Sequence, residues 1–366
     1  MQHPENDDLY RGLKVNKGVA DVPTVNPYLK KRIQRKEYTP SEFVEGILKG
    51  NITILSQAVT LVESSKYEHQ QVAQEIIEKC LPHAGKSVRI GITGVPGAGK
   101  STSIDAFGMH LIGEGRKLAV LAIDPSSERS KGSILGDKTR MEALSREKNA
   151  FIRPSPSAGS LGGVARKTRE TIVLCEAAGF DTVFVETVGV GQSETAVHSM
   201  VDFFLLIQLA GTGDELQGIK RGIMEMADGI IINKADGDNL EKAKLAAAQF
   251  RNALHLFPAP ESGWFPKVLT YSGYYNLGIK EIWDMVGEYM EFTKKNGYFN
   301  YKRNEQAKYW MYESINDTLR ETFYHNPAVE NMLSFTEQQV LNNEISSFVA
   351  AKRMMDLFLE NLSAKK

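Results

Sequence analysis

Short apolar runs alternate with helical patterns over the middle of the chain. The runs are rich in β-branched residues; they begin at Val88 and recur at Leu118–Ile123, Ala150–Arg153, Thr182–Thr187, Phe203–Leu209, Ile230–Asn233 and Val268–Ser272. This alternation predicts repeated βαβ units. Several runs are apolar without a period of two, which predicts a mostly parallel sheet with helices on both faces. We therefore expect an α/β fold that binds its ligand at the carboxyl ends of the strands.

Helical patterns precede and follow this α/β region. The segment from Thr39 to Glu42 has an N-cap, a proline at the first helical position and a glutamate at the third, and further helices are predicted over 52–64 and 69–80. After Tyr298, apolar stripes at helical spacing need a covering surface, so we expect self-association. The predicted regions are a polar arm (1–38), an N-terminal helical region (39–86), the α/β domain (87–297) and a C-terminal helical dimerisation region (298–366).

The composition narrows the range of partners. The chain has 366 residues and a formal net charge of -1. It therefore lacks the excess of basic residues that would indicate a nucleic-acid partner. The cysteines, Cys80 and Cys175, lack C-x-x-C or histidine spacing, which is typical of buried thiols in a reducing compartment. The first residues have neither a secretory nor a transit pattern, and the apolar runs are too short to cross a bilayer. We expect a cytoplasmic protein with no membrane or nucleic-acid partner.

The segment from Val88 to Ser101 combines a predicted strand, a glycine-rich turn and a helix start, and the turn matches G-x-x-x-x-G-K-[ST]. Glycines let successive backbone N–H groups face a polyphosphate, and the helix N-terminus adds a positive dipole end. Lys100 suits the β- and γ-phosphates, and the Ser101 hydroxyl suits Mg²⁺. We therefore expect a P-loop NTPase domain. Its predicted nucleotide-binding residues here are Gly94, Val95, Pro96, Gly97, Ala98, Gly99, Lys100, Ser101 and Thr102.

A second motif, N-K-A-D from Asn233 to Asp236, follows an apolar strand further along the chain. The Asp236 carboxylate matches the N1–H and exocyclic amine of guanine, a donor pair that adenine lacks. The motif therefore predicts guanine, although a strand-end turn capped by Asn and Asp is the other interpretation. The predicted base-binding residues are Asn233, Lys234, Asp236, Ser272 and Gly273.

Three carboxylates at or near predicted strand ends are candidates to hold Mg²⁺ together with Ser101: Asp124, Asp137 and Glu186. Asp124 is also explained as a helix N-cap and Asp137 as an exposed loop residue. Glu186 is different, because a carboxylate that closes an apolar strand needs a partner.

The segment after Glu186 predicts a loop that responds to the γ-phosphate. Gly189 and Gly191 free its backbone, and Gln192 is the nearest amide able to orient a water. No glutamine directly follows Gly189, so we expect slow intrinsic hydrolysis that a partner completes. The predicted catalytic residues are Lys100, Glu186 and Gln192. The polar loop 211–221 is either a third nucleotide-responsive loop or a solvated turn, and its candidate partner-binding residues are Asp214, Glu215, Gln217, Lys220 and Arg221.

Together, the motifs GVPGAGKS, IDPSS, ETVGVGQSE, AGTGDELQGIKRGI and NKAD resemble those of the accessory GTPases of the methylmalonyl-CoA mutase system, the MeaB group, also called ArgK-type. The resemblance covers essentially 39–362, and the family's glutamate in place of the D-x-x-G aspartate matches Glu186 and Gly189. It implies GTP or GDP as the bound nucleotide, Mg²⁺ as cofactor and a homodimer with a C-terminal helical arm. It also implies gating of adenosylcobalamin delivery to a B12-dependent acyl-CoA mutase such as methylmalonyl-CoA mutase, and removal of damaged cofactor, with loop 211–221 sensing the mutase.

Three other functions share this architecture. A nickel-insertion GTPase, a metallochaperone for another metal centre, usually carries clusters of Cys and His ligands, which the seven scattered histidines do not form in the sequence. A transport-linked ATPase or kinase, as the ArgK name implies, lacks here an H-R-D-type catalytic loop for a protein substrate. A nucleotide-binding scaffold without turnover is the third alternative. The prediction is a GTPase that hydrolyses GTP to GDP and phosphate.

Overall fold

The structure is a computed structural model that describes residues 38–123, 141–154, 161–187, 193–210 and 221–364. The chain divides into two units, 1–39 and 40–366, and the second is described here by itself. Its first part consists of three helices, α1 (Pro40–Leu48), α2 (Ile52–Glu63) and α3 (Tyr67–Cys80), which pack on one another and on α6. The helix predicted from the Thr39–Glu42 pattern therefore begins at Pro40, as expected.

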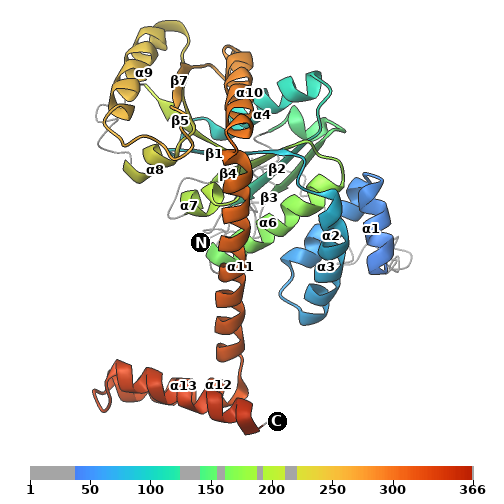
Figure 1. Cartoon of the computed structure of the whole chain (residues 1–366), viewed down its shortest axis with the longest axis vertical. Helices are drawn as coiled ribbons and strands as arrows, with labels where there is room; N and C mark the ends of the chain where they lie inside the picture. Colours follow the sequence, from blue (N-terminus) through green and yellow to red (C-terminus); the bar gives the residue numbers. More distant parts are fainter. Residues whose placement is uncertain (1–37, 124–140, 155–160, 188–192, 211–220, 365–366) are drawn as a thin grey trace, which may run out of the picture. The chain divides into compact units, whose positions relative to one another are not determined.

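Seven parallel strands form one sheet in the order β3-β2-β4-β1-β5-β6-β7, with the strand of the glycine-rich loop at its centre (Figure 1). Every residue of the strands at 118–123, 182–187 and 229–233 is buried, which explains the apolar runs of the sequence. The α/β prediction is thereby confirmed. The strands are β1 (Val88–Gly94), β2 (Leu118–Ile123), β3 (Ala150–Pro154), β4 (Thr182–Thr187), β5 (Phe203–Leu209), β6 (Gly229–Asn233) and β7 (Lys267–Thr270).

Helices cover both faces of the sheet, as the unbroken apolar runs predict. One face packs on α4 (Lys100–Gly113) and α10 (Ile279–Lys295), which share a core with Ile90, Phe203 and Leu205. On the other face lie α6 (Leu161–Ala177), α7 (Ser193–His198), α8 (Arg221–Met226) and α9 (Leu240–Leu254), and α9 buries its alanines against Ile230 and Ile232. Short 3₁₀ turns complete the domain at Leu81–His83, Leu144–Arg146 and Gly237–Asn239.

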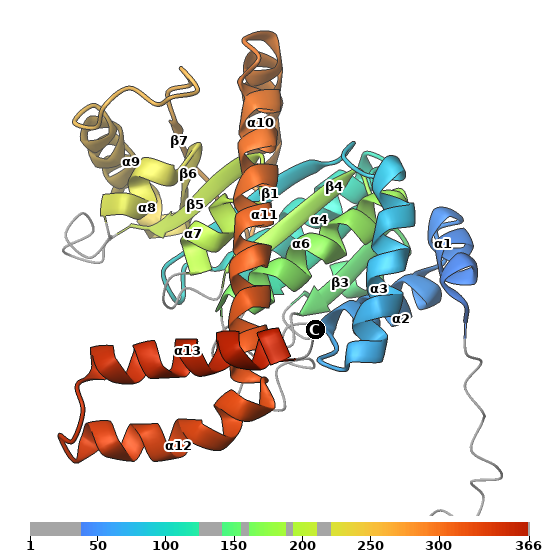
Figure 2. The same cartoon turned by 60° about the horizontal axis from the view of Figure 1, so that its bottom comes forward.

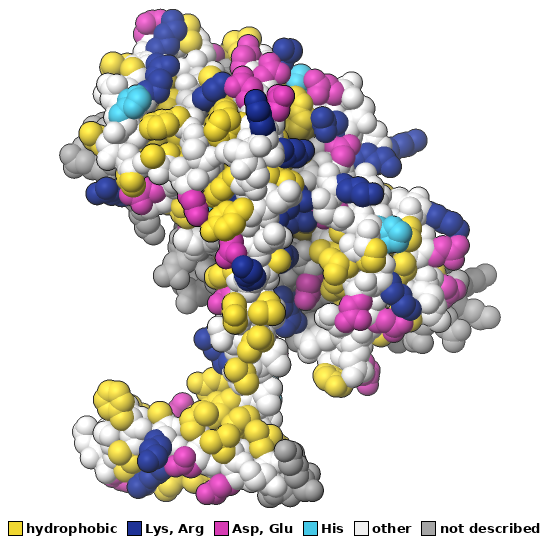
Figure 3. Space-filling model, viewed as in Figure 1, with side chains coloured by type: hydrophobic (Ala, Val, Ile, Leu, Met, Phe, Trp, Pro, Cys, Tyr) yellow, Lys and Arg dark blue, Asp and Glu magenta, His cyan; other side chains and the backbone are white. Residues whose placement is uncertain are grey.

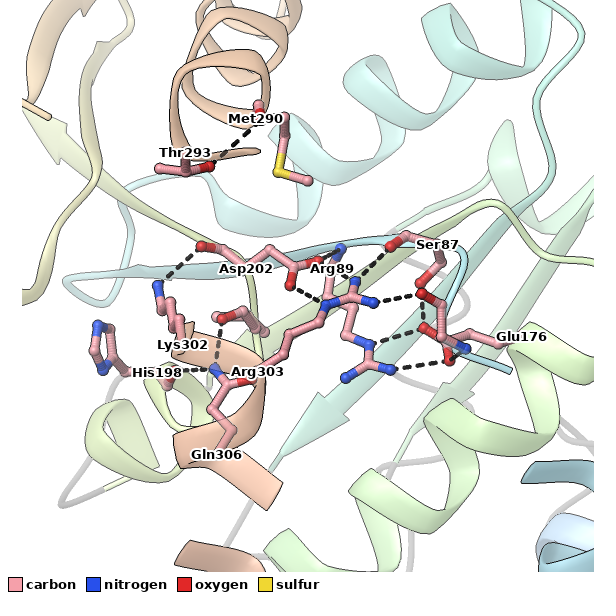
Figure 4. Close-up of polar contacts among 12 residues, drawn as sticks. Ser87, Arg89, Glu176, His198, Asp202, Met290, Thr293, Lys302, Arg303 and Gln306 are labelled. Carbon is pink, nitrogen blue, oxygen red and sulfur yellow. Dashed lines mark hydrogen bonds and ion pairs between the residues drawn. The ribbon is translucent and has the colours of Figure 1, made fainter. Parts of the chain in front are cut away.

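A buried ion pair joins β1 to α6 at the amino-terminal edge of the sheet (Figure 4). Arg89 donates hydrogen bonds to Glu176 at 2.8 and 2.9 Å, and only 9% of Arg89 and 6% of Glu176 is exposed. The carboxylate also accepts from the Gly85 N–H at 2.6 Å and the Ser87 hydroxyl at 2.5 Å. Burial by itself would raise the pKa of Glu176, but these donors outweigh it, so the pKa lies below its ordinary value.

The helix α11 (Tyr298–Tyr324) is fastened to the same edge of the sheet by hydrogen bonds. Arg303 donates two of them to Asp202, the residue before β5, at 2.8 and 2.7 Å (Figure 4). Further along the helix, Gln306 and the Trp310 indole N–H donate to carbonyl groups in residues 199–201, at 2.8 and 3.0 Å. The first half of α11 is therefore locked onto the segment that links α7 to β5.

The second half of α11 continues beyond these contacts and leads to a helical hairpin of α12 (Pro327–Leu341) and α13 (Ser347–Ala364), which pack on each other (Figures 1 and 2). We call this part, residues 311–364, the C-terminal arm. Its small core consists of Val329, Met354 and Phe358 with Phe323 and Leu333. None of the described helices is long and apolar enough to cross a membrane.

Candidate functional site

The sheet brings the predicted motifs to one edge. Glu186 of β4 pairs in register with Ile92 of β1, and Asn233 of β6 pairs with Leu209 of β5, two strands away from the glycine-rich loop. The carboxyl ends of all seven parallel strands point the same way, so the loop after β1, Glu186 and the N-K-A-D motif share that edge. This is the position that the βαβ pattern predicts for a ligand.

The backbone of the glycine-rich loop leaves no room for a side chain at two of its glycines. Gly99 has a φ of +86°, and a Cβ on Gly94 would lie 2.3 Å from the Ile207 carbonyl oxygen, so a side chain at either position is strained. The Lys100 Nζ donates to the Gly94 carbonyl at 2.9 Å and the Val95 carbonyl at 3.4 Å. The ammonium thus lies inside the loop, directly before the first turn of α4.

Glu186 finds its partner in the loop. Its Oε1 lies 3.4 Å from the Ser101 hydroxyl, and only 6% of the residue is exposed. A carboxylate and a hydroxyl this close are hard oxygen donors of the type that Mg²⁺ takes. The structure therefore brings together two of the four predicted metal ligands, whereas Asp124 and Asp137 lie outside the described residues.

A side-chain hydrogen bond between β1 and β4 was not predicted. The Thr187 hydroxyl donates to the Thr93 hydroxyl at 2.9 Å, and both residues are almost completely buried. Each lies directly beside a predicted site residue, because Thr93 precedes Gly94 and Thr187 follows Glu186. No sequence signal reveals this pair, since a threonine in a strand is ordinary.

Asn233 ties the two motifs together. Its Nδ2 donates to the Ala98 carbonyl of the loop at 2.8 Å, and its Oδ1 accepts from the Gly273 N–H at 3.2 Å and the Lys234 N–H at 2.7 Å. A Cβ on Gly99 would lie 2.5 Å from this Nδ2, which explains the glycine. The asparagine therefore fixes the distance between the phosphate loop and the N-K-A-D motif.

The predicted base-binding residues also lie together. The Ser272 hydroxyl donates to the Asp236 carboxylate, and Ala235 N–H donates to the Tyr271 carbonyl at 3.0 Å. The last strand ends at Thr270 and not at Ser272 as predicted, because Ser272 pairs instead with Leu277 in a tight turn. This turn places the Gly273 N–H against the Asn233 side chain of the motif.

The remaining predictions are only partly covered by the described residues. Arg221 is exposed at the start of α8, where it contacts Glu225 at 3.1 Å. The catalytic candidate Gln192 and the loop candidates Asp214, Glu215, Gln217 and Lys220 lie outside the described residues. Within the described ranges no group of three or more His, Cys, Asp or Glu side chains forms a metal-binding cluster. Both cysteines are buried there, and burial raises the pKa of Cys80 to about 11.

Known proteins resemble this chain over most of its length. The family model described as Methylmalonyl Co-A mutase-associated GTPase MeaB matches residues 55–328. GTPase ArgK of Escherichia coli is 44% identical over 320 residues, 87% of this chain and 97% of that protein. A putative GTPase of Caulobacter vibrioides is 50% identical over 312 residues, 85% of this chain and 95% of that protein. The mouse protein named methylmalonic aciduria type A homolog, mitochondrial, is 44% identical over 323 residues, 86% and 78% of the two chains.

A solved structure also resembles this chain over most of its length. The one titled "LAO/AO transport system kinase" has 38% identity and a TM-score of 0.69, and it covers 88% of this chain and 99% of that one. The prediction of a P-loop NTPase fold is thus confirmed, and so is the prediction of a GTPase that uses a guanine nucleotide. Since the family model covers well over half of the chain, this protein belongs to the MeaB family of methylmalonyl-CoA mutase-associated GTPases.

Proposed function

We propose that this GTPase is a nucleotide-controlled chaperone of a B12-dependent acyl-CoA mutase, with methylmalonyl-CoA mutase as the first candidate. In this proposal GTP binding and hydrolysis gate the loading of adenosylcobalamin and the removal of damaged cofactor. The observation that carries the proposal is the meeting of a phosphate loop, Glu186 and the N-K-A-D motif at one sheet edge, in a chain whose family is described as mutase-associated.

At the phosphate end, Lys100 is the central residue of the proposed mechanism. Its ammonium exchanges the carbonyl oxygens of Gly94 and Val95 for the β- and γ-phosphates, which offer it full negative charge. As water attacks the γ-phosphate in line, charge on the phosphoryl oxygens is stabilised by this ammonium and by the N–H groups of the loop. Gln192 is proposed to orient the water, and Glu186 to hold the phosphate end of the site in register.

The residues around Ser101 fit a bound Mg²⁺. The Ser101 hydroxyl and the Glu186 carboxylate supply the hard oxygens, and Asp124 and Asp137 are proposed to complete the set. When bound, the ion would neutralise negative charge on the phosphate oxygens.

At the other end of the site, Asp236 is proposed to select guanine. Its carboxylate accepts from the N1–H and the exocyclic amine. The N–H groups of Ser272 and Gly273 donate instead to the Leu277 carbonyl at 3.0 Å and to the Asn233 Oδ1 at 3.2 Å, so they hold the motif in place. The hydrogen bond from the Ser272 hydroxyl fixes the orientation of the carboxylate before a nucleotide arrives. Lys234 completes the motif beside them.

We also propose a homodimer that is built on the C-terminal arm. Hydrophobic side chains gather along the distal part of α11 and on α12 and α13 (Figure 3), and the exposed fractions of Leu319, Phe335 and Phe348 are 61%, 58% and 85%. An apolar groove of about 850 Å³ runs between these helices. Large exposed apolar surfaces mark association sites, and a second copy supplies a matching surface. Light scattering should therefore give twice the chain mass, and Leu319→Glu together with Phe335→Glu should give the monomer.

The experiment that tests the chaperone role follows [γ-³²P]GTP in single turnover with and without methylmalonyl-CoA mutase. We expect slow release of inorganic phosphate that the mutase accelerates, and co-migration of the two proteins that depends on GDP or a non-hydrolysable GTP analogue. The partner loop, from Asp214 to Arg221, is the first place to mutate for loss of that acceleration. Label transferred to protein instead of released as phosphate would favour a kinase, and no response to any B12 mutase would remove the chaperone proposal.

A further inference from the structure

A short turn beside the N-K-A-D motif exposes two tyrosines. Ser272 and Leu277 close the turn with two backbone hydrogen bonds of 3.0 Å, and Asn276 adopts a φ of +55° at its tip. Tyr274 is 81% exposed and Tyr275 is 59% exposed, with their rings edge to face at 4.9 Å. Exposed aromatic rings on so short and closed a turn are held ready for a ligand at little further cost in conformational entropy.

The turn is anchored to both ends of the proposed nucleotide site. The Ser272 hydroxyl donates to Asp236 and accepts from the Tyr275 N–H at 3.3 Å, while the Gly273 N–H donates to Asn233 at 3.2 Å. A Cβ at Gly273 would lie 2.5 Å from the Tyr271 hydroxyl oxygen, so the turn is packed closely on the Tyr271 side chain. The backbone from which the two rings project is therefore held by the same Ser272 hydroxyl that orients the Asp236 carboxylate.

Only one of the two tyrosines borders the cleft next to this site. The cleft has a volume of about 750 Å³, and Tyr274 lines it together with Gly273 and with Thr102 and Met109 of α4. Thr102 is the last of the residues predicted to bind the phosphates, and Gly273 is one of those predicted to bind the base, so the cleft adjoins both parts of the proposed site. A ligand that joins a phosphate to a planar base spans this space.

We propose that Tyr274 stacks on the face of the guanine base, and this rests on the proposed guanine recognition by Asp236. A carboxylate holds only the edge of a purine, and the apolar faces of the base still need cover. Aromatic rings stack on bases with a strength that depends little on base identity. Tyr274 therefore adds affinity, and Asp236 supplies the choice of base.

The test is calorimetry of the full chain with GDP and with inosine diphosphate, which lacks the exocyclic amine but keeps the purine face. Tyr274→Ala should lower the binding affinity for both nucleotides by the same factor, about tenfold. Tyr274→Phe should keep the affinity of the parent, because it keeps the ring. Tyr275→Ala is the matched control, since it removes the same side chain from the same turn without removing a wall of the cleft, and should weaken binding much less.

Three outcomes would overturn the stacking role: unchanged affinity in Tyr274→Ala, an equal loss in Tyr275→Ala, or a loss in Tyr274→Phe as large as in Tyr274→Ala. These differ from failure of guanine recognition. In that case the parent protein would bind GDP and inosine diphosphate equally, and Asp236→Ala would change neither.

Discussion

At the amino-terminal edge of the sheet, Arg89 and Arg303 face carboxylates, whereas at the carboxyl edge Lys100 faces two backbone carbonyl oxygens. Both edges hold buried or half-buried cations on hydrogen bonds of ordinary length. The difference lies in the acceptors, because Glu176 and Asp202 carry full charges and carbonyl groups carry only partial ones. An incoming anion can therefore replace these two carbonyl groups but has no advantage over the carboxylates that face the arginines.

This contrast assigns different tasks to the two edges. The amino-terminal edge joins β1, α6, β5 and α11 into one body, from which the C-terminal arm extends (Figures 2 and 4). The carboxyl edge is held by hydrogen bonds such as the one from Asn233 to the Ala98 carbonyl. A rigid edge thus supports an exchangeable one, as a ligand site requires.

The largest effect is expected from breaking the amino-terminal edge. Glu176→Ala leaves the Arg89 guanidinium buried without its carboxylate, and loss of one partner of a buried pair costs about 3–5 kcal/mol of unfolding free energy. Urea denaturation followed by circular dichroism measures it, and Glu176→Gln serves if the alanine variant does not fold. Lys280→Ala is the control, because its pair with Asp284 is exposed and is worth less than about 1 kcal/mol. Similar losses in both variants would contradict the comparison.

At the carboxyl edge we expect a substitution to lower the rate of GTP hydrolysis strongly and the stability only a little. Lys100→Ala removes the ammonium that the mechanism places on the phosphates, and loss of one such donor lowers a rate by about 10²–10³-fold. Two of its hydrogen bonds are to neutral carbonyl groups, and the loss of such a bond costs about 1 kcal/mol, so the unfolding free energy should fall less than in Glu176→Ala. Single-turnover GTP hydrolysis and urea denaturation on the same preparation measure both quantities. If the variant lost stability but kept its hydrolysis rate, Lys100 would be a structural residue.

The pKa of Glu176 gives the amino-terminal edge a distinct pH dependence. Because this pKa is lower in the folded protein than its ordinary value of 4.5, the folded state binds fewer protons, and the stability from this group is present above pH 4.5. It is lost as the pH falls through the folded value, at no more than about 1.4 kcal/mol per pH unit. Urea midpoints between pH 7 and pH 3 should therefore fall more steeply in the parent than in Glu176→Gln. Parallel curves would show that the carboxylate is not held ionised.

These two edges were not equally predictable from the sequence. The residues of the carboxyl edge fall in compact motifs, such as the loop from Gly94 to Ser101 and N-K-A-D, because backbone geometry around a phosphate demands glycines at fixed spacing. The strands were predictable for a similar reason, since burial on both faces requires an apolar run. Their ends were less so: β7 stops at Thr270 because Ser272 joins the turn.

The amino-terminal edge leaves no such local pattern. Arg89 and Glu176 are 87 residues apart in the chain, and Arg303 reaches Asp202 across 101 residues. In the sequence each of them is an ordinary charged residue, because only the fold places it beside its partner. The C-terminal stripes were visible in the sequence, but the division of α11 into a fastened half and an exposed half depends on hydrogen bonds from Gln306 and Trp310 that only the structure reveals.

The smallest quantity to measure is the coupling between the hydroxyl groups of Thr93 and Thr187, which join the two strands that carry the site. Thr187→Val leaves the Thr93 hydroxyl buried without its partner, and Thr93→Val does the reverse, so each should cost about 1–3 kcal/mol of unfolding free energy. The double variant removes both hydroxyl groups and keeps the shape, so it should lose less than the sum of the two. Urea denaturation of all four proteins gives the coupling.

The same variants report on the site, because Thr187 directly follows Glu186 and Thr93 directly precedes Gly94. If the hydroxyl pair positions Glu186 beside Ser101, all three variants should hydrolyse GTP more slowly, and the double variant should regain stability without regaining rate. If rate returned together with stability, the pair would serve folding alone. If the effects of the two substitutions on unfolding free energy and on hydrolysis rate simply added, the hydroxyl pair would not couple β1 to β4.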